Sequence, residues 1–263
     1  MDAAPRRSLG RTGLTVSPVG FGAFKIGRNE GIKYAEGYDL PDDDACGRLL
    51  HAVLDLGIDL IDTAPAYGIS EARVGRHLAD RRDEFVLSTK AGETFENGVG
   101  RHDFSASGID ASIDRSLDRL RTDRLDVVFV HSDGRDQAII EAGEALDVLV
   151  RRRDRGDVRA IGFSGKTVDG HLAAIATGLI DCLMVEYHEL DPSQRPVLEA
   201  AEDAGVGVLV KKGLASGRLA AEAAIPFCLA GPAVASVVIG SLRIENLGRN
   251  LEIARAATAA PGR

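Results

Sequence analysis

Tryptophan is absent from the 263-residue chain, and cysteine and methionine are scarce, with three and two copies. Cys46, Cys182 and Cys228 show no CxxC spacing, so we expect neither a zinc site nor any other metal. The odd number of cysteines, with a polar amino terminus that lacks a secretory hydrophobic segment, favours a reducing, cytoplasmic location. Cys182 lies in an apolar run, and we expect it in the core.

Long apolar runs and an excess of positive charge are missing as well. No apolar run approaches the roughly 20 residues that a membrane-spanning helix needs, and the formal net charge is −8 at pH 7. Both features argue against a membrane or a nucleic acid as partner. Arg151–Arg153 is a local basic run that we interpret as the solvated end of a helix. We expect a monomer or a weak homo-oligomer that acts on a small molecule.

Hydrophobic residues, by contrast, make up 44% of the chain, enough for a substantial core. The length of 263 residues allows one large α/β domain or two small ones. Residues 7–16 predict a small hairpin around the turn Gly10–Gly13. Short apolar segments and segments of helical periodicity then alternate. The predicted strands are 18–22, 58–62, 85–90, 125–131, 158–164, 182–187, 206–211 and 236–240. The predicted helices lie near 43–56, 71–81, 106–121, 137–153, 168–177, 193–204, 219–230 and 244–257.

Runs such as Val127–Val130 are apolar throughout, which is typical of parallel strands covered on both faces. The recurring strand–helix units predict a closed (α/β)8 TIM barrel with a short N-terminal β-hairpin. An open, doubly wound sheet is the alternative. Gly20–Lys25 lacks the third glycine of a dinucleotide fingerprint, however, and a long loop follows it. No linker divides the chain, so we expect a single barrel domain over residues 1–263.

Four side chains that can handle protons stand at or near consecutive strand ends. Asp62 ends the second strand, Lys90 the third and His131 the fourth, while Tyr67 follows Asp62 by five residues. The carboxyl ends of barrel strands share one face, where catalytic groups gather. Taken singly, each residue fits an ordinary role: a turn cap, a solvated lysine, a core-edge histidine or a packed tyrosine. Their coincidence at neighbouring strand ends favours a catalytic site.

The combination suits proton transfer to an oxygen. Tyrosine has an unperturbed pKa near 10, too high for efficient proton transfer at neutral pH. We expect the charge of Lys90 to bring the pKa of Tyr67 below that value, with Asp62 holding the lysine. His131 can orient a carbonyl oxygen through a hydrogen bond. None of these groups supplies a hydride, so a nicotinamide cofactor is implied.

From about Leu9 to Ala257 the chain resembles the aldo-keto reductases. The resemblance implies an (α/β)8 barrel that reduces aldehydes and ketones, usually with NADPH. It assigns Tyr67 as the general acid, Lys90 as its pKa partner, Asp62 as the partner of the lysine and His131 as the carbonyl-orienting group. The segments that carry it are Gly57–Gly68, Leu87–Lys90, Leu125–His131 and Ile161–Ser164.

The resemblance also implies contacts to the nicotinamide half of the cofactor. Gly22, Ala23 and Asp62 match the segment along the nicotinamide and ribose, and Ser164 matches a contact to the carboxamide.

Three positions depart from the family pattern. Gly165 stands in place of an asparagine, Met184 in place of a glutamine, and Lys211 in place of the tyrosine that stacks on the nicotinamide. Lys211 stays in the predicted cofactor site, and the departures do not affect the four predicted catalytic residues.

The segment Ile239–Asn250 resembles the family's site for the adenosine 2′-phosphate. Ser241 and Arg243 are the predicted phosphate contacts, and Asn246 and Asn250 the contacts at the adenine end. A strand followed by a helix N-terminus is a natural anion site. Without the resemblance, an ordinary capped helix with a solvated arginine explains the segment equally well.

Two long loops, 25–41 and 91–105, are expected to shape an open substrate pocket. Tyr34, Tyr38, Phe95 and Phe104 are its candidate lining residues, although each could instead pack its own loop.

Together these observations predict a cytoplasmic, NADP(H)-dependent reductase of a small carbonyl substrate. Two alternatives remain open: an NAD-linked dehydrogenase of the same fold, and a nucleotide-binding regulatory or accessory subunit with little turnover.

Overall fold

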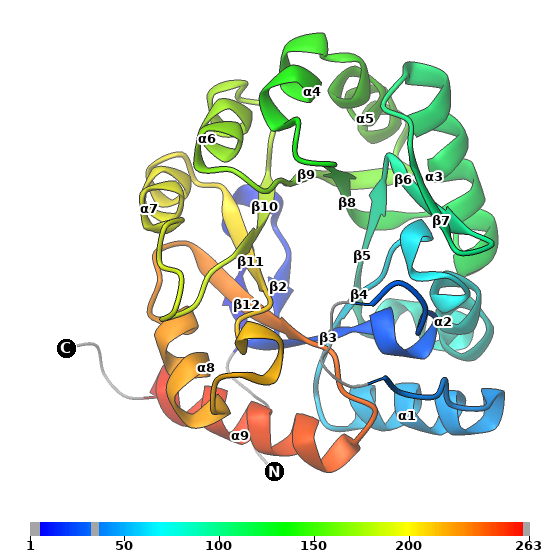
Figure 1. The fold of residues 1–263 in the computed structure, drawn as a ribbon, viewed down its shortest axis with the longest axis vertical. Coiled ribbons are helices and arrows are strands. Elements are labelled where there is room, and N and C mark those ends of the chain that lie inside the picture. The colour runs from blue at the N-terminus through cyan, green and yellow to red at the C-terminus, as the bar shows by residue number, and fades with distance from the viewer. Residues whose placement is uncertain (1–5, 33–36, 260–263) are drawn as a thin grey trace.

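The computed structural model describes residues 6–32 and 37–259. Eight parallel strands close into a barrel, which Figure 1 shows as a ring surrounded by helices. The barrel strands are β3 (Val19–Gly22), β4 (Leu60–Asp62), β5 (Val86–Ala91), β8 (Leu125–His131), β9 (Val158–Ser164), β10 (Cys182–Glu186), β11 (Gly207–Lys211) and β12 (Val234–Ile239). They neighbour one another in chain order, and β12 pairs with β3 to close the ring. The predicted fold is confirmed.

The helices outside the ring connect successive strands, except the last, which follows β12. They are α1 (Asp43–Asp55), α2 (Ser70–Leu78), α3 (Ala106–Leu120), α4 (Asp136–Ala142), α5 (Glu144–Arg155), α6 (Val168–Ala176), α7 (Arg195–Asp203), α8 (Ala221–Leu229) and α9 (Ile244–Ala259). One large apolar core lies between the helices and the outward side chains of the strands. A smaller core fills the inside of the barrel, and it includes Cys182 and Met184. The cysteine is therefore a core residue, as expected.

The N-terminal hairpin closes the bottom of the barrel. Its strands β1 (Arg7–Ser8) and β2 (Thr15–Val16) pair antiparallel, and Leu9, Leu14 and Val16 join the interior core. In Figure 1 this hairpin is the blue segment seen through the ring.

Residues 91–105, expected to be a loop, instead contain a second hairpin. Strands β6 (Glu93–Glu96) and β7 (Val99–His102) pair antiparallel. The two residues between them, Asn97 and Gly98, have φ of 52° and 78°. Asn-Gly with two positive φ values is the favoured two-residue hairpin turn, because its twist matches that of the strands. This dipeptide was the local signal for the hairpin.

The helix predicted over 137–153 is two helices. It breaks at Gly143, whose φ of 74° places it in the left-handed region, and α4 ends there while α5 begins. Glycine adopts this conformation without the steric cost that a side chain brings.

The expectation of a solvated basic run fails for its middle residue. Arg152 is 2% exposed. Its guanidinium lies 2.7 Å from carboxylate oxygens of Asp110 and Asp114 and 2.9 Å from one of Asp157. Three carboxylates replace the water that the cation loses, so this arginine ties α5 to α3.

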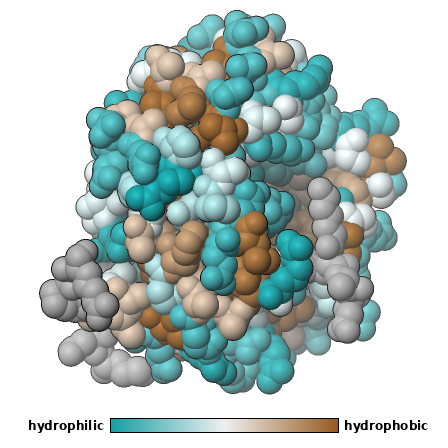
Figure 2. Space-filling view, turned by 60° about the vertical axis from the view of Figure 1, so that its left-hand side comes forward, coloured by the Kyte–Doolittle hydropathy of each residue, from teal (hydrophilic) through white to brown (hydrophobic). Residues whose placement is uncertain are grey.

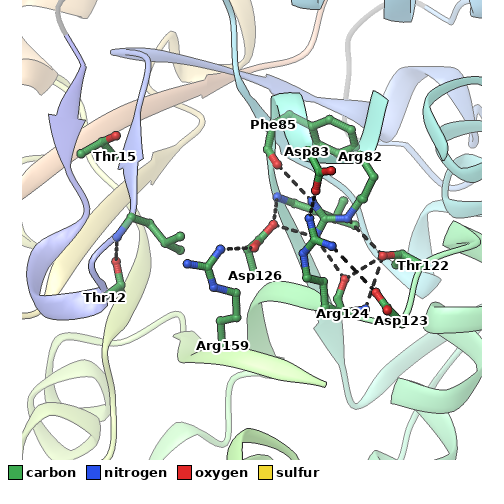
Figure 3. Close-up of polar contacts among 12 residues, drawn as sticks. Thr12, Thr15, Arg82, Asp83, Phe85, Thr122, Asp123, Arg124, Asp126 and Arg159 are labelled. Carbon is green, nitrogen blue, oxygen red and sulfur yellow. Dashed lines mark hydrogen bonds and ion pairs between the residues drawn. The ribbon is translucent and has the colours of Figure 1, made fainter. Parts of the chain in front are cut away.

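A second buried ion cluster lies where β5, β8 and β9 begin, opposite the end that carries the predicted site (Figure 3). Asp126 accepts hydrogen bonds from Arg82 at 2.7 Å, from the Leu87 amide at 2.9 Å and from Arg159 at 2.9 Å. Both carboxylate oxygens of Asp126 are therefore satisfied away from water.

Apolar residues on the face shown in Figure 2 occur as small groups among polar ones. Within residues 6–32 and 37–259, no helix has the length and apolar character needed to cross a membrane.

Candidate active site

Lys90 and Asp62 form a buried ion pair at the carboxyl ends of two neighbouring strands. Asp62 ends β4, and Lys90 lies one residue before the end of β5. The ammonium Nζ of Lys90 lies 2.8 Å from both carboxylate oxygens of Asp62 and 2.8 Å from the Thr63 carbonyl oxygen. Ser88 donates a further 2.7 Å hydrogen bond to Asp62. The predicted lysine–aspartate partnership is therefore present in the structure.

Tyr67 lies over this ion pair. It ends a 3₁₀ turn, Pro65–Tyr67, and the following Gly68 has a φ of 61°. Lys90 Nζ is 4.7 Å from the centroid of the phenol ring, and the edge of Phe24 packs on that ring at a centroid distance of 5.1 Å. The turn thus carries the phenol from the end of β4 back over Lys90.

His131 completes the predicted group of four. It ends β8, and its ring centroid lies 6.4 Å from that of Tyr67. Its Nδ1 lies 2.8 Å from Glu93 Oε2 on the unexpected hairpin. Among the described residues, none forms a hydrogen bond with Nε2 of His131. Glu93 is a site residue that sequence reasoning missed, because it required recognising the Asn97-Gly98 hairpin first.

Burial and charge compete at these groups. Burial lowers the pKa of Lys90, but the charge and hydrogen bonds of Asp62 and the contact with Tyr67 together outweigh burial, so that the net shift of this pKa is upward. The ammonium is therefore charged at neutral pH. Burial lowers the pKa of His131, and the opposing Glu93 carboxylate does not restore it. The imidazole is therefore mainly neutral at pH 7.

The expected direction of the pKa shift at Tyr67 is wrong. Burial raises the pKa of the phenol above 10, and the charge of Lys90 offsets only part of that rise. Placing a phenolate away from water costs more than one nearby ammonium returns. Lys90 therefore acts on the pKa of Tyr67 in the expected sense, but it does not bring the value below 10.

Ser164 and Lys211 face the group of four from other strands. Ser164 ends β9 and pairs in register with His131. Lys211 ends β11, which is four strands from β5 in either direction around the ring. Lys211 Nζ donates hydrogen bonds of 3.0 Å to Ser164 Oγ and to the Gly165 carbonyl oxygen. Met184, by contrast, lies in the interior core, 1% exposed.

The loop after β9 is fixed by residues that sequence reasoning did not select. The Gly165 amide donates a 3.2 Å hydrogen bond to His171 Nε2, while His171 Nδ1 lies 2.9 Å from Gln194 Oε1. Burial lowers the pKa of His171 to about 4, so this ring is neutral at pH 7. Asp136 accepts hydrogen bonds from the Lys166 and Thr167 amides at 2.8 and 2.7 Å. These contacts hold the backbone on which Ser164 and Gly165 stand.

The predicted phosphate site lies between β12 and α9. Ser241 Oγ accepts a 3.1 Å hydrogen bond from the Arg243 amide. The Arg243 side chain is 76% exposed, and its closest described carboxylate, that of Glu245, is 4.0 Å away. Asn246 is exposed on the first turn of α9, and Asn250 is buried one turn later. A hydroxyl, an exposed guanidinium and an amide at a helix N-terminus suit a phosphate group.

Between this site and Asp62, the backbones at the ends of β3 and β12 lie close together. Gly22 pairs in register with Asp62 and precedes Ala23, which is fully buried. A Cβ at Gly240 would meet the Gly22 carbonyl oxygen at 3.2 Å, and one at Gly22 would meet Val238 at 3.1 Å. The glycines therefore keep the ends of β3 and β12 free of side chains, as a bound cofactor would require.

The four candidate lining residues have different surroundings. Tyr34 lies outside the described residues. The Tyr38 hydroxyl donates a hydrogen bond to the Arg28 carbonyl oxygen within its own loop. The Arg28 guanidinium lies 3.4 Å from the centroid of Phe95, which joins the 25–41 loop to the hairpin. Phe104 packs against the core.

Comparisons with known proteins agree with this geometry. A family model described as the aldo/keto reductase family matches residues 18–224. D-threo-aldose 1-dehydrogenase of a Pseudomonas species is 32% identical, over 79% of this chain and 69% of its own length. L-galactose dehydrogenase of Arabidopsis thaliana is 34% identical, over 81% of this chain and 66% of its own length. The chain thus spans about two thirds of the length of these relatives.

Two solved structures match nearly the whole chain. A protein from Pseudomonas aeruginosa described as a putative aldo-keto reductase is 42% identical, covers 96% of each chain and superposes with a TM-score of 0.88. The holo form of an aldo-keto reductase from Bacillus halodurans is 26% identical, covers 99% of this chain and 92% of its own, and gives a TM-score of 0.83. This chain therefore belongs to the aldo/keto reductase family, a family of oxidoreductases that use nicotinamide cofactors.

Proposed function

We propose that this protein reduces an aldehyde or ketone to an alcohol with NADP(H), and that Tyr67 donates the proton. The observation that carries the proposal is the position of Lys90. Its ammonium is bound to both oxygens of Asp62 and lies 4.7 Å from the centroid of the Tyr67 ring. A cation so placed stabilises the phenolate that forms when the proton leaves.

His131 positions the carbonyl oxygen in this proposal. Its ring lies beside Tyr67, so an oxygen placed between the two side chains can take the tyrosine proton while it contacts the imidazole. When bound, the nicotinamide supplies the hydride to the carbonyl carbon. Tyr67 then supplies the proton to the oxygen, and Lys90 stabilises the resulting phenolate until solvent restores the proton.

The preference for NADP(H) rests on Arg243. Its guanidinium is exposed and has no closer described carboxylate than one at 4.0 Å, which leaves it available for a 2′-phosphate. NAD(H) lacks that phosphate and cannot gain the charge-assisted hydrogen bond.

One alternative has a specific observation in its favour. Two of the relatives are named as dehydrogenases, and another as an NADH-specific methylglyoxal reductase. An NAD-linked enzyme that works mainly toward oxidation is therefore the second candidate.

The test is a panel of aldehydes and ketones with NADPH and NADH, combined with calorimetry of both cofactors. Arg243→Ala should weaken NADP(H) binding by about tenfold or more, the scale of a lost charge-assisted hydrogen bond, and leave NAD(H) binding unchanged. Arg249→Ala is the matched control, because Arg249 lies on α9, the helix that directly follows Arg243, and already pairs with Glu222. Equal affinity for both cofactors in the unaltered protein would reject the NADP preference.

Turnover decides between an enzyme and an accessory subunit. Cofactor binding without oxidation of either reduced cofactor across the whole panel would favour the accessory subunit. Oxidation of alcohols with NAD, and slow reduction in the opposite direction, would favour the dehydrogenase.

A further inference from the structure

Lys211 is a cation without a carboxylate partner at the mouth of the barrel. Its Nζ donates to Ser164 Oγ and to the Gly165 carbonyl oxygen, both at 3.0 Å. No carboxylate among residues 6–32 and 37–259 forms an ion pair with it, whereas Lys90 is paired with Asp62 and Lys212 with Glu186. Two neutral acceptors therefore hold this ammonium in place without neutralising it.

The charges that face Lys211 are mostly positive. Lys212 follows it on β11, Lys90 faces it from β5, and Lys166 faces it from the loop after β9. Among the described residues, the carboxylate that acts most on Lys211 is that of Glu186 on β10, which is already bound by Lys212. Two neutral histidines, His131 on β8 and His171 on α6, also lie close enough for the charge of Lys211 to act on them.

This environment makes the charge of Lys211 sensitive to pH near neutrality. Burial, together with the charges of Lys212 and Lys90, lowers the pKa of Lys211 to about 7. The side chain is then cationic in weakly acidic solution and largely neutral in weakly alkaline solution.

The chemistry of the proposed function brings a second positive charge into this mouth. The carbonyl carbon has to lie beside the oxygen that Tyr67 and His131 contact, so the ring that gives up the hydride shares the mouth with Lys211. A reduced nicotinamide is neutral. Loss of the hydride, with both of its electrons, leaves the ring positively charged. Coulomb repulsion between two cations that share a partly desolvated site is substantial.

We propose that the Lys211 ammonium discriminates between the two redox states of the cofactor, disfavouring the oxidised, cationic nicotinamide and leaving the reduced form bound. The inference rests on the proposed function, since it requires a nicotinamide in this mouth. Lys211 would thereby promote release of the oxidised cofactor after each reduction.

Calorimetry of NADP⁺ and freshly prepared NADPH at several pH values tests the inference. The measured quantity is the ratio of the two dissociation constants, oxidised over reduced. Phosphate groups are common to both forms, and their ionisation cancels in this ratio. A group with a pKa of about 7 goes from mostly charged at pH 6.5 to mostly neutral at pH 8.5. The ratio should therefore fall by about fourfold across that range.

Two variants of Lys211 and one of its neighbour Lys212 separate the effect of charge from that of shape. Lys211→Met should remove the pH dependence and leave the low ratio that the unaltered protein reaches at pH 8.5. Lys211→Arg should keep a high ratio at every pH, because arginine stays protonated. Lys212→Met should keep the pH dependence but displace it to higher pH, because the charge of Lys212 helps to lower the pKa of Lys211. Thermal unfolding checks that each variant is folded. If Lys211→Met fails to fold, the comparison of the unaltered protein with Lys211→Arg still tests the inference.

The outcomes separate this inference from the proposed function. A ratio that does not change with pH in the unaltered protein, or one that changes equally in Lys211→Met, would overturn the role of Lys211 while the enzyme stays a reductase. If neither redox form binds, with the NAD pair measured in the same way, the proposed function falls and this inference falls with it.

Discussion

At Tyr67, burial and charge act on the pKa of the phenol in opposite directions, and burial prevails. The reductive rate requires the protonated phenol, so it falls only as pH rises through that pKa. Because burial raises the pKa above 10, kcat/KM of the unaltered protein should show no limb from Tyr67 below about pH 10. A fall near neutral pH must then come from another group, such as Lys211.

Removing the proton donor tests the same residue directly. Tyr67→Phe keeps the ring that packs on Phe24 but removes the hydroxyl, so kcat should fall by at least about 10²-fold while the cofactor Kd stays unchanged. Steady-state kinetics and calorimetry measure the two quantities. A phenylalanine variant that turns over at the original rate would mean that another group donates the proton.

Lys90 can be tested through its charge. Lys90→Met keeps much of the stem but removes the ammonium. The pKa of Tyr67 then rises further, because the ammonium no longer opposes the effect of burial. Reduction should slow by about 10²-fold or more, and any remaining alkaline limb should move to higher pH. If chemistry limits the rate and the limb stays in place, Lys90 and Tyr67 are not coupled.

Glu93 is predicted to act through His131. Its carboxylate, 2.8 Å from Nδ1, raises the pKa of the imidazole against the effect of burial. Glu93→Gln should therefore lower the pKa of His131 further, and KM for the carbonyl should rise by about tenfold as the ring loses its orientation. Proton NMR titration of His131 and substrate kinetics give the two values.

The matched control is Glu96→Gln, an exposed position on the same strand. It should leave the pKa of His131 and KM unchanged. If both variants behave alike, the hairpin carries no specific contact to the histidine, and Glu93 has no positioning role.

At the scale of elements, the loop after β9 depends on a histidine that stays neutral. His171 accepts from the Gly165 amide through Nε2, and burial lowers its pKa to about 4. A depressed pKa means that the folded state binds this proton less readily than the unfolded chain, for which the pKa is near 6.5. The corresponding stability is present above pH 6.5 and is lost as pH falls toward 4.

This loss amounts to about 3 kcal/mol of unfolding free energy over that interval. His171→Asn should be less stable at pH 7, but its stability should decline less between pH 6.5 and pH 4. His51→Asn, at an exposed position of α1, should follow the unaltered protein. Urea denaturation at a series of pH values measures the difference, and parallel curves for His171→Asn and the unaltered protein would exclude this account.

The elements also show how far sequence reasoning reaches. The eight barrel strands and the group around Tyr67 were predictable, because continuous apolar runs and strand-end polar residues are local patterns. The β6–β7 hairpin had a local signal in Asn97-Gly98, which a search for helices and parallel strands passes over. The contacts of Glu93, His171 and Arg152 had none, since each partner is brought close only by the closed barrel. The pKa of Tyr67 likewise depends on burial, which no local pattern reports.

For the whole molecule, one end of the barrel carries the proposed chemistry and the other contributes to stability. The proposed chemistry lies at the carboxyl ends of the strands, and the ion cluster of Asp126 in Figure 3 lies at the other end. Asp126→Asn should lower the unfolding free energy by about 3 kcal/mol, because it leaves buried Arg82 without its charge partner, and should not alter the cofactor Kd. Asp123→Asn, 91% exposed beside this cluster, is the control. A loss of cofactor affinity in Asp126→Asn would mean that the two ends are coupled.

The hairpin that closes the bottom of the barrel also constrains the order of folding. Arg7 Nε donates a hydrogen bond to the Val234 carbonyl oxygen, 227 positions away in the chain, and the Arg11 amide donates to Gly205. These partners belong to the last quarter of the sequence. During synthesis the hairpin therefore cannot make these contacts with the barrel until β11 and β12 have left the ribosome. Leu9, Leu14 and Val16 remain uncovered through most of translation, and they join the interior core only after nearly the whole ring has been made.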